Sequence, residues 1–471
     1  MSGRPTPRPA AMPPGASLWR RARTGLQSAL GLFQAGAFSS GGVGRHRVAS
    51  LPFFKRRWHY TVREPELIRE ILVNRAGDFP KSVMMDDMLR ELIGSSAFVI
   101  NGETWRWKRA ILDAALQQAR VRQVFARMRE AADAALDRLE AAARAGPVAV
   151  DVEMTHFAAD VIFRTLFSEP IPGDDVGQVI RSFEAFQGVA YAHAILRQSR
   201  LPVGLLPGAW RMRRAARAIR AILDKPLERR MAAIRADAPR PANDIVASLA
   251  RESDPATGRA FDRRDLLDEV AMLFLAGHET SANALAWSLY LLAANPDIQD
   301  EARREATRVL AERAPDFADM KALNLIRDVF REALRLYPPV AVIARDATCP
   351  EYMAGRDIAP GAVLYVAPWI MHRQARFWDR PEVFDPARFE TEAGKQAVRS
   401  AYLPFSIGPR VCPGAAFALQ EATLVLAMLL RRFRFEVAPG HTPSPIARLT
   451  LGSANGVRLV VTPMEVMEAL S

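Results

Sequence analysis

The stretch FSIGPRVCPG, residues 405–414, contains one of only two cysteines in the chain. Cys412 stands two residues after Arg410 and just ahead of a long apolar run with helical spacing. Pro413 is of a residue type preferred at the first position of a helix, so we expect the helix to begin there. The positive end of the helix dipole and the nearby arginine both favour a thiolate over a thiol.

Three further residues of this stretch shape the surroundings of the sulfur. Gly408 and Gly414 leave space where a flat group can approach the backbone, and Phe405 provides an apolar wall. A thiolate in such a pocket suits the axial position of a haem iron, toward which it pushes electron density. A structural thiol in an ordinary loop is the alternative that these ten residues leave open.

Composition favours one large domain. The chain has 471 residues, of which 49% are hydrophobic, and no linker or repeat interrupts residues 60–465. Two cysteines exclude a disulfide framework and favour a reducing compartment. The net charge is +12, but the arginine-rich run 210–235 indicates a solvated helix face, and no nucleic-acid motif is present. No apolar run approaches the roughly 20 residues of a membrane span.

The N-terminal region is basic throughout, since residues 1–63 contain no Asp or Glu. We expect residues 1–16 to be a disordered, proline-rich segment and residues 17–36 to form an amphipathic helix. A transit peptide and weak contact with a membrane surface both stay open for this region.

Helical spacing dominates the rest of the chain. We expect helices at 64–74, 102–116, 121–146, 154–168 and 261–297, and a further helix that ends in 331–340. Short strands are expected as a hairpin-like pair at 48–62 and around 341–348 and 361–369. The helix at 261–297 is the longest, and Asp262 is its expected N-cap. Its apolar pattern is interrupted by AGHET, residues 276–280, and buried polar groups there need partners.

FSIGPRVCPG resembles the cysteine loop F-x-x-G-x-R-x-C-x-G of the haem-thiolate monooxygenases, the cytochromes P-450, of the soluble bacterial type. The resemblance implies that Cys412 is the proximal iron ligand and that Arg410 contacts a haem propionate. It also implies a mainly α fold with small β-sheets, the cytochrome P-450 fold, with haem b between the long central helix and the cysteine-loop helix. Residues 17–471 would form a single haem domain.

Three other motifs follow the family's order. Glu332 and Arg335 match its E-x-x-R motif, whose partner would be Arg388 in PARF, where alanine replaces the usual glutamate. AGHET is similar to its A/G-G-x-D/E-T motif, so Glu279 and Thr280 inherit the role of a proton relay at the oxygen-binding face.

In the same motif, Gly277 would open a groove for O₂ and water, and His278 is left as a surface-facing relay residue of undecided role. The third motif is W-x-x-x-R, met by Trp105 and Arg109, which with Arg345 would hold the propionates. Residues 38–46 are rich in glycine where relatives have a more regular strand, so the start of the first strand is not set.

The resemblance implies a lipophilic substrate, such as a fatty acid or terpenoid, that is hydroxylated with one atom of O₂. Its pocket would be lined by residues 80–98, 185–206, 272–276 and 340–343, which are rich in Met, Leu, Ile and Ala. Arg197 and Arg200 are candidates for holding a carboxylate at the mouth, with solvated surface as the plainer alternative.

No dinucleotide loop, flavin domain or iron–sulfur cysteine set is present, so electrons must come from a separate ferredoxin, flavodoxin or reductase. A basic patch of Arg106, Lys108 and the loop near Arg410 would steer an acidic carrier. The bacterial cytoplasm is the expected location. A haem-thiolate peroxygenase or isomerase without a redox partner, and a non-catalytic haem sensor, are the alternatives.

Overall fold

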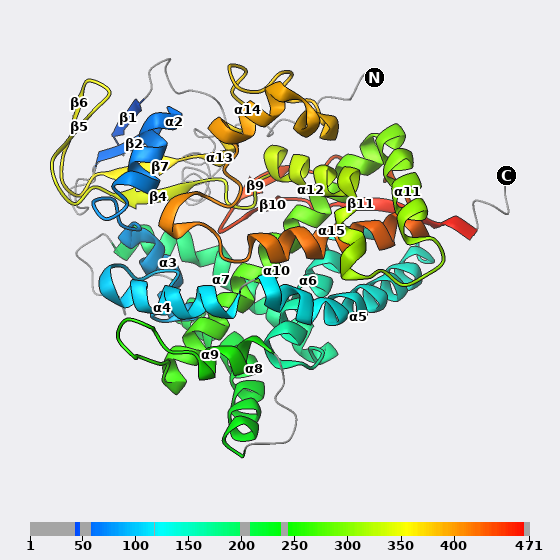
Figure 1. The fold of residues 1–471 in the computed structure, drawn as a ribbon, viewed down its shortest axis with the longest axis horizontal. Coiled ribbons are helices and arrows are strands. Elements are labelled where there is room, and N and C mark those ends of the chain that lie inside the picture. Colours follow the sequence, from blue (N-terminus) through cyan, green and yellow to red (C-terminus); the bar gives the residue numbers. More distant parts are fainter. Residues whose placement is uncertain (1–42, 48–57, 117, 198–207, 237–243, 466–471) are drawn as a thin grey trace.

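A computed structural model describes residues 43–47, 58–116, 118–197, 208–236 and 244–465 (Figure 1). The segment expected to be disordered, 1–16, and the expected amphipathic helix, 17–36, lie outside these residues. The described chain is mainly helical with four small sheets, as the sequence predicts.

The helices cover most of the molecule. They are α2 (Pro65–Arg69), the π-helix η1 (Glu70–Asn74), α3 (Val83–Ile93), α4 (Gly102–Ala115), α5 (Gln118–Ala143), α6 (Val150–Phe167), α7 (Gly173–Arg197), α8 (Ala209–Arg235), α9 (Ile245–Arg251), α10 (Arg263–Ala294), α11 (Pro296–Leu310), α12 (Asn324–Leu336), α13 (Pro368–Met371), α14 (Glu392–Ala401) and α15 (Ala415–Arg432), with 3₁₀ turns η3 (Phe317–Lys321), η4 (Pro386–Glu390) and η5 (Gly408–Arg410).

The strands are short. They are β1 (Val43–Arg47), β2 (Trp58–Val62), β3 (Val148–Ala149), β4 (Ile343–Asp346), β5 (Glu351–Met353), β6 (Arg356–Ile358), β7 (Val363–Val366), β8 (Phe433–Val437), β9 (Pro445–Ala447), β10 (Leu451–Ser453) and β11 (Arg458–Pro463). The largest sheet has the order β1-β2-β7-β4, with only the β2–β7 pair parallel.

The hairpin predicted at 48–62 is confirmed for its second strand only, because residues 48–57 lie outside the described part of the chain. Its second strand is β2, but the partner strand β1 comes earlier, at Val43–Arg47, inside the glycine-rich segment where the sequence left the start unset. Gly44 does not prevent a strand there, since Val43–Arg47 pairs over its whole length with β2.

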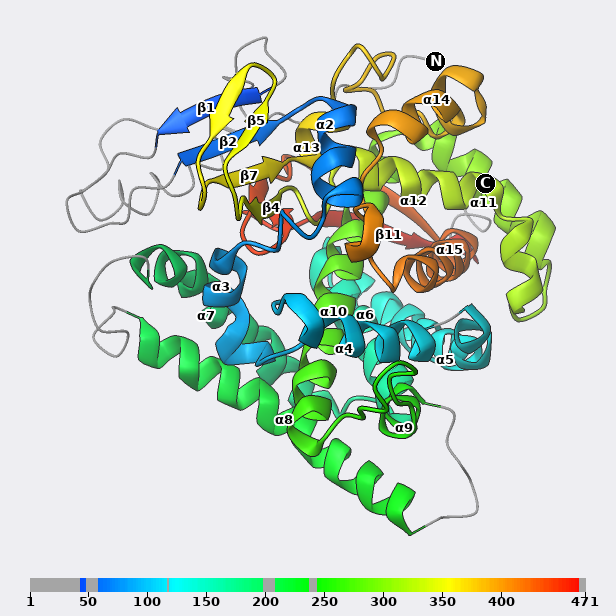
Figure 2. The same ribbon diagram turned by 60° about the vertical axis from the view of Figure 1, so that its left-hand side comes forward.

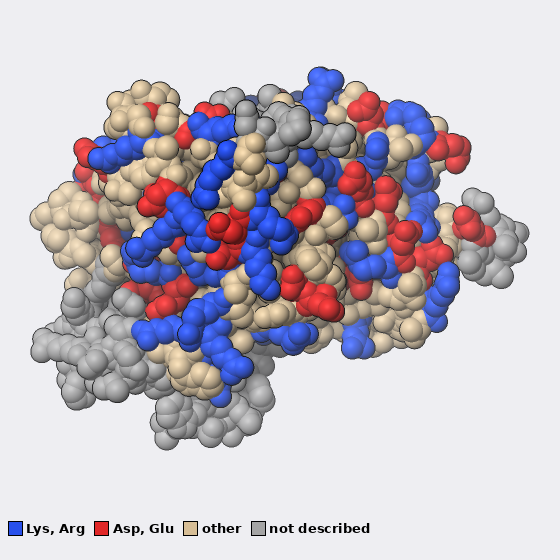
Figure 3. All heavy atoms as spheres, turned by 90° about the horizontal axis from the view of Figure 1, so that it is seen from below, with Lys and Arg blue, Asp and Glu red and all other residues tan. Residues whose placement is uncertain are grey.

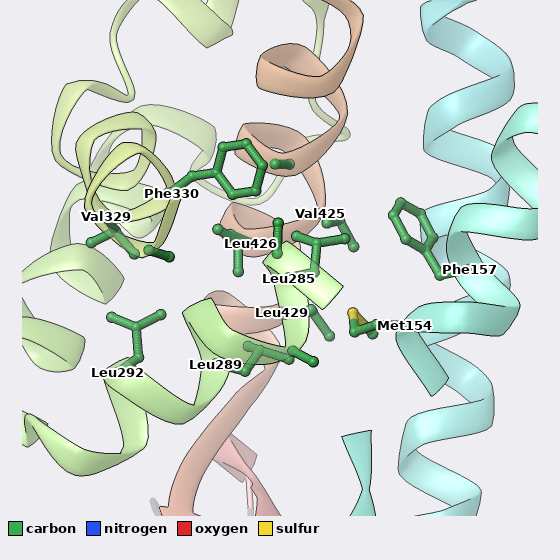
Figure 4. Close-up of a cluster of buried hydrophobic side chains, with 14 of the residues drawn as sticks. Met154, Phe157, Leu285, Leu289, Leu292, Val329, Phe330, Val425, Leu426 and Leu429 are labelled. Atoms are coloured by element: carbon green, nitrogen blue, oxygen red, sulfur yellow. The ribbon is translucent and has the colours of Figure 1, made fainter. Parts of the chain in front are cut away.

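Helix α10 runs through the centre of the molecule and organises the core. At about 1.5 Å per residue its 32 residues span about 48 Å. As predicted, Asp262 caps it, accepting the backbone N–H of Asp265 at 2.7 Å. Figure 4 shows how its second half packs: leucines at 285, 289 and 292 meet side chains from α6, α12 and α15.

The arginine-rich run 210–235 forms α8, which extends along the lower edge of the molecule in Figure 2. Some of its arginines form exposed ion pairs, but Arg220 reaches the buried carboxylate of Asp268 at 2.7 Å, and Arg230 reaches that of Asp244 at 2.7 Å. The expected solvated face is therefore only part of the helix. On the side of the molecule shown in Figure 3, acidic side chains are interspersed among the basic ones.

Candidate active site

The cysteine loop is closed by its own backbone. The Cys412 N–H donates to the carbonyl of Phe405 at 2.9 Å, and the Val411 N–H donates to that of Gly408 at 3.0 Å. Helix α15 then begins at Ala415 with Gly414 as its N-cap, because the Gly414 carbonyl already accepts the Ala418 N–H at 2.9 Å. The prediction that the helix begins at Pro413 is therefore wrong by two residues.

The sulfur of Cys412 lies deep in the protein and yet remains accessible. Burial raises the pKa of the Cys412 thiol, while the Gly414 N–H, Arg109 and Lys81 act in the opposite direction. Cys412 is nevertheless exposed. A group that is surrounded by protein but accessible faces an internal recess. The protein alone thus favours the thiol, and Arg410 is not among the cations that act on it; a metal ion would deprotonate such a thiol by coordination.

The two glycines of the loop meet different structural requirements. Gly408 has a φ of 77°, and a Cβ there would lie 2.1 Å from the carbonyl oxygen of Leu72. This glycine therefore permits close packing against η1, and not the approach of a flat group as the sequence suggested. A Cβ at Gly414 would meet only the Cys412 sulfur, at 3.8 Å, which leaves open space beside it. Phe405 is half-buried and packs against the main core.

A cluster of cations lies beside Cys412. Burial lowers the pKa of Arg345 to about 10 and that of Arg410 to about 9, the latter with help from Arg345 and Arg109. Burial also lowers the pKa of Lys81, and the three arginines add to this effect while Cys412 opposes it. Within the described residues, the only ion pair of these four cations joins Arg109 to Asp113, at 2.7 Å.

Such a cluster lacks negative charge, since buried cations are normally paired. The two carboxylates of a haem would supply it, so the donor set fits the propionates of haem b. The guanidinium of Arg410 also stacks on Trp105, 3.8 Å from the ring centroid, and donates to the carbonyls of Ala97 and Ile100. The structure thus brings together Trp105, Arg109, Arg345, Arg410 and Cys412, which the sequence named separately.

Lys81 is the member of the cluster that the sequence analysis missed. A backbone bridge pairs it with Arg345, and its ammonium donates to the Phe98 carbonyl at 2.5 Å and lies 3.6 Å from the Phe98 ring centroid. A single lysine in FPKS has no pattern of its own, and only the pairing with β4 shows where it lies.

The E-x-x-R residues form a buried network. Two parallel bonds of 2.8 Å join Arg335 to Glu332, and Arg388 donates to the same carboxylate at 2.9 Å. Glu332 and Arg335 have no exposed side-chain surface. The network closes although Ala387 replaces the usual glutamate, so that departure costs none of these contacts.

An apolar cavity of about 180 Å³ lies against α10. Its walls come from three of the four predicted segments: residues 84–98, 272–276 and 340–342. None of its described lining residues comes from 185–206. The side chain of Arg197 and all of Arg200 lie outside the described part. The sequence missed a wall formed by Ala447, Arg448, Leu449 and Thr450.

Glu279 and Thr280 both line this cavity. The Thr280 hydroxyl donates to the Ala276 carbonyl at 2.6 Å. Burial raises the pKa of Glu279 to about 7, against the opposing effect of hydrogen bonds from Thr450 and Gln187 and the charge of Arg448. A carboxyl group with this pKa can both take and give a proton near neutral pH.

Ala276 of AGHET also lines the cavity, whereas Gly277 and His278 do not. A Cβ at Gly277 would lie 3.0 Å from Ile162, so this glycine allows close packing of α10 on α6 and the expected groove is wrong. His278 is buried, its Nδ1 lies 2.7 Å from the Phe274 carbonyl, and burial lowers its pKa to about 4. It does not face the surface, because its ring packs against Phe183 and Phe274 inside the protein.

The predicted basic patch is also wrong in part. Lys108 is buried, with its ammonium 2.6 Å from Asp265 and 3.6 Å from Glu269, and it ties α4 to α10. Arg410 is turned inward, as described above. Of the residues named for this patch, Arg106 is exposed.

The site combines an accessible thiol, four cations of which only Arg109 has a carboxylate partner among the described residues, and a carboxyl of near-neutral pKa beside an apolar cavity. This combination fits a haem-thiolate oxygenase. The sequence model of the Cytochrome P450 family matches residues 53–459, and the chain belongs to this family. It is a cytochrome P450 monooxygenase that binds haem b and uses O₂, an organic substrate and a redox partner.

The chain is similar to proteins from distant organisms. It is 30% identical to cyclooctatin synthase of Streptomyces melanosporofaciens over 86% of both chains, and 30% identical to cyclooctat-9-en-7-ol 5-monooxygenase of the same species over 81% of both. It is 29% identical to protein LUTEIN DEFICIENT 5, chloroplastic, of Arabidopsis thaliana, over 85% of this chain and 69% of that protein. Among the described residues, no helix combines the length and apolarity needed to cross a membrane.

Proposed function

We propose that the chain hydroxylates a lipophilic substrate held in the cavity along α10, with Cys412 as the iron ligand. The observation that supports this proposal most is that an accessible thiol lies beside four cations. Among the described residues, only one of these cations has a carboxylate partner. Bound there, haem b would activate O₂, one atom of which enters the substrate while the other leaves as water.

The protein's own residues would do three things. Arg345, Arg410, Arg109 and Lys81 would hold the haem carboxylates, with Trp105 stacked on Arg410 to fix its guanidinium. The Met- and Leu-rich wall would bind the hydrocarbon and exclude water.

The third task is proton delivery. Glu279 would take protons from solvent and release them toward the Thr280 hydroxyl, since its carboxyl is held by Gln187 and Thr450 at the cavity wall. The relay thus begins at a group whose pKa lies close to neutral pH.

The finer assignments are part of the same proposal. The electron donor would be a separate ferredoxin, flavodoxin or reductase, and the bacterial cytoplasm would be the location. The name of one relative states that it is a monooxygenase acting at position 5 of cyclooctat-9-en-7-ol. This supports a substrate that is oxidised at a carbon atom of its skeleton.

The test is the carbon monoxide spectrum of the reduced holoprotein, measured for the parent and for Cys412→Ser. Thiolate ligation shifts the Soret band of the ferrous carbonyl to long wavelength. We expect the shifted band in the parent and its loss in the variant, with haem still bound through the propionate contacts. A shifted band in Cys412→Ser would show that Cys412 is not the iron ligand.

A further inference from the structure

One cation in the cavity wall lies outside the cation cluster beside Cys412 and forms no ion pair with another described residue. Arg448 lies in the turn between β9 and β10, and it is the only Lys or Arg among the described residues that line the cavity. Its side chain is exposed and also part of the lining, so a ligand in the cavity can reach its guanidinium.

Arg448 has no carboxylate of its own within the described part of the chain. The nearest acid in the lining is Glu279, whose oxygens are taken by the Gln187 amide and the Thr450 hydroxyl, while Arg448 acts on it only through its charge. The remaining lining is Met, Leu, Ile, Val and other largely apolar residues. A guanidinium that has no carboxylate partner and borders such a wall is available to pair with an anionic group of the ligand.

The turn that carries Arg448 is held in place. The Arg448 N–H donates to the Thr450 carbonyl at 2.9 Å, and the Leu451 N–H donates to that of Pro339 at 2.9 Å. Asn283 of α10 donates to the Thr450 hydroxyl at 2.9 Å. The guanidinium is therefore presented from a turn fixed to two other walls of the cavity, which favours recognition of one end of a ligand.

We propose that the substrate of this oxygenase is a lipophilic carboxylic acid whose carboxylate is bound by Arg448. This inference rests on the proposed function and narrows its substrate class. The planar guanidinium matches a carboxylate with two parallel hydrogen bonds, and the apolar wall takes the hydrocarbon part. Arg448 is the residue that would distinguish an acid from a neutral molecule of the same shape.

The test compares acids with alcohols of the same skeleton on the holoprotein: decanoic acid with 1-decanol, and adamantane-1-carboxylic acid with 1-adamantanemethanol. Binding is followed by calorimetry and by the Soret shift. We expect at least one acid to bind about 10- to 100-fold more tightly than its alcohol. Arg448→Gln should remove that preference and leave the alcohol affinity unchanged, and Arg448→Lys should keep part of it.

Arg458→Gln is the matched control, because Arg458 is an exposed arginine of β11 outside the cavity lining. The inference is overturned if neither acid binds better than its alcohol, or if Arg448→Gln weakens acid and alcohol alike. Its failure is separate from failure of the proposed function, which would show as a missing thiolate band in the carbon monoxide spectrum of the parent.

Discussion

Replacing Glu332 by glutamine should destabilise the protein strongly, because this one carboxylate balances two buried arginines. It accepts two bonds of 2.8 Å from Arg335 and one of 2.9 Å from Arg388, and it also accepts the Asp385 N–H at 3.1 Å. Glutamine keeps the size of the side chain but removes the charge and turns an N–H₂ group toward a guanidinium. Leaving buried charges unpaired typically costs about 3–5 kcal/mol.

Part of that cost is offset by contacts that the variant keeps. Arg335 also donates to the carbonyls of His372, Pro381 and Val383, so it does not lose every partner. We therefore expect Glu332→Gln to lower the free energy of unfolding by about 3 kcal/mol, the lower end of that range.

The assay is urea unfolding of the holoprotein at constant pH, followed by far-ultraviolet circular dichroism and by haem absorbance. The midpoint is converted to free energy only where the slope stays unchanged. Glu436→Gln is the control, because Glu436 is 62% exposed and 3.6 Å from Arg434, a surface pair worth about 1 kcal/mol or less. If the two variants shift the midpoint equally, the network does not carry the stability assigned to it.

Two other outcomes are expected. Thr280→Ala should keep haem binding and the thiolate band but consume more electrons per product molecule, since it removes the hydroxyl beside Glu279; equal coupling in variant and parent would contradict the relay. Burial raises the pKa of Glu421 to about 8, so between about pH 4.5 and 8 the folded protein holds a proton that the unfolded chain has lost, and stability falls with rising pH by up to about 1.4 kcal/mol per unit. Glu421→Gln should flatten this fall in a pH series of unfolding curves, and an unchanged slope would count against it.

Local sequence patterns predict much of the site, and helical periodicity predicts the burial of a further residue. The cysteine loop, the E-x-x-R pair and the long helix were all readable because each needs only neighbouring residues. The burial of Lys108 was readable too: it shares the spacing i, i+3, i+4, i+7 with Ile111, Leu112 and Ala115, which are the other buried residues of α4. Charge alone had suggested a surface position.

The partners of Glu279 had no such signal. Gln187 lies 92 residues earlier in the sequence and Thr450 lies in a turn between two three-residue strands. Neither has a motif around it, and only tertiary packing brings them to one carboxyl group. The same holds for Lys81 and Arg448, whose positions depend on a backbone bridge to β4 and on the turn after β9.

Helix α10 connects the wall of the apolar cavity with the cation cluster through the acidic residues of its first half. Glu269 accepts the Ala97 N–H at 2.9 Å, and Asp268 accepts the Ser95 N–H at 2.8 Å. The carbonyl of the same Ala97 then accepts from Arg410 at 3.3 Å. The acidic side chains of this half-helix therefore hold the loop whose carbonyls orient the guanidinium of Arg410. One helix thus positions both the cavity-lining Glu279 and the loop beside Arg410, which explains why its polar residues fall on more than one face.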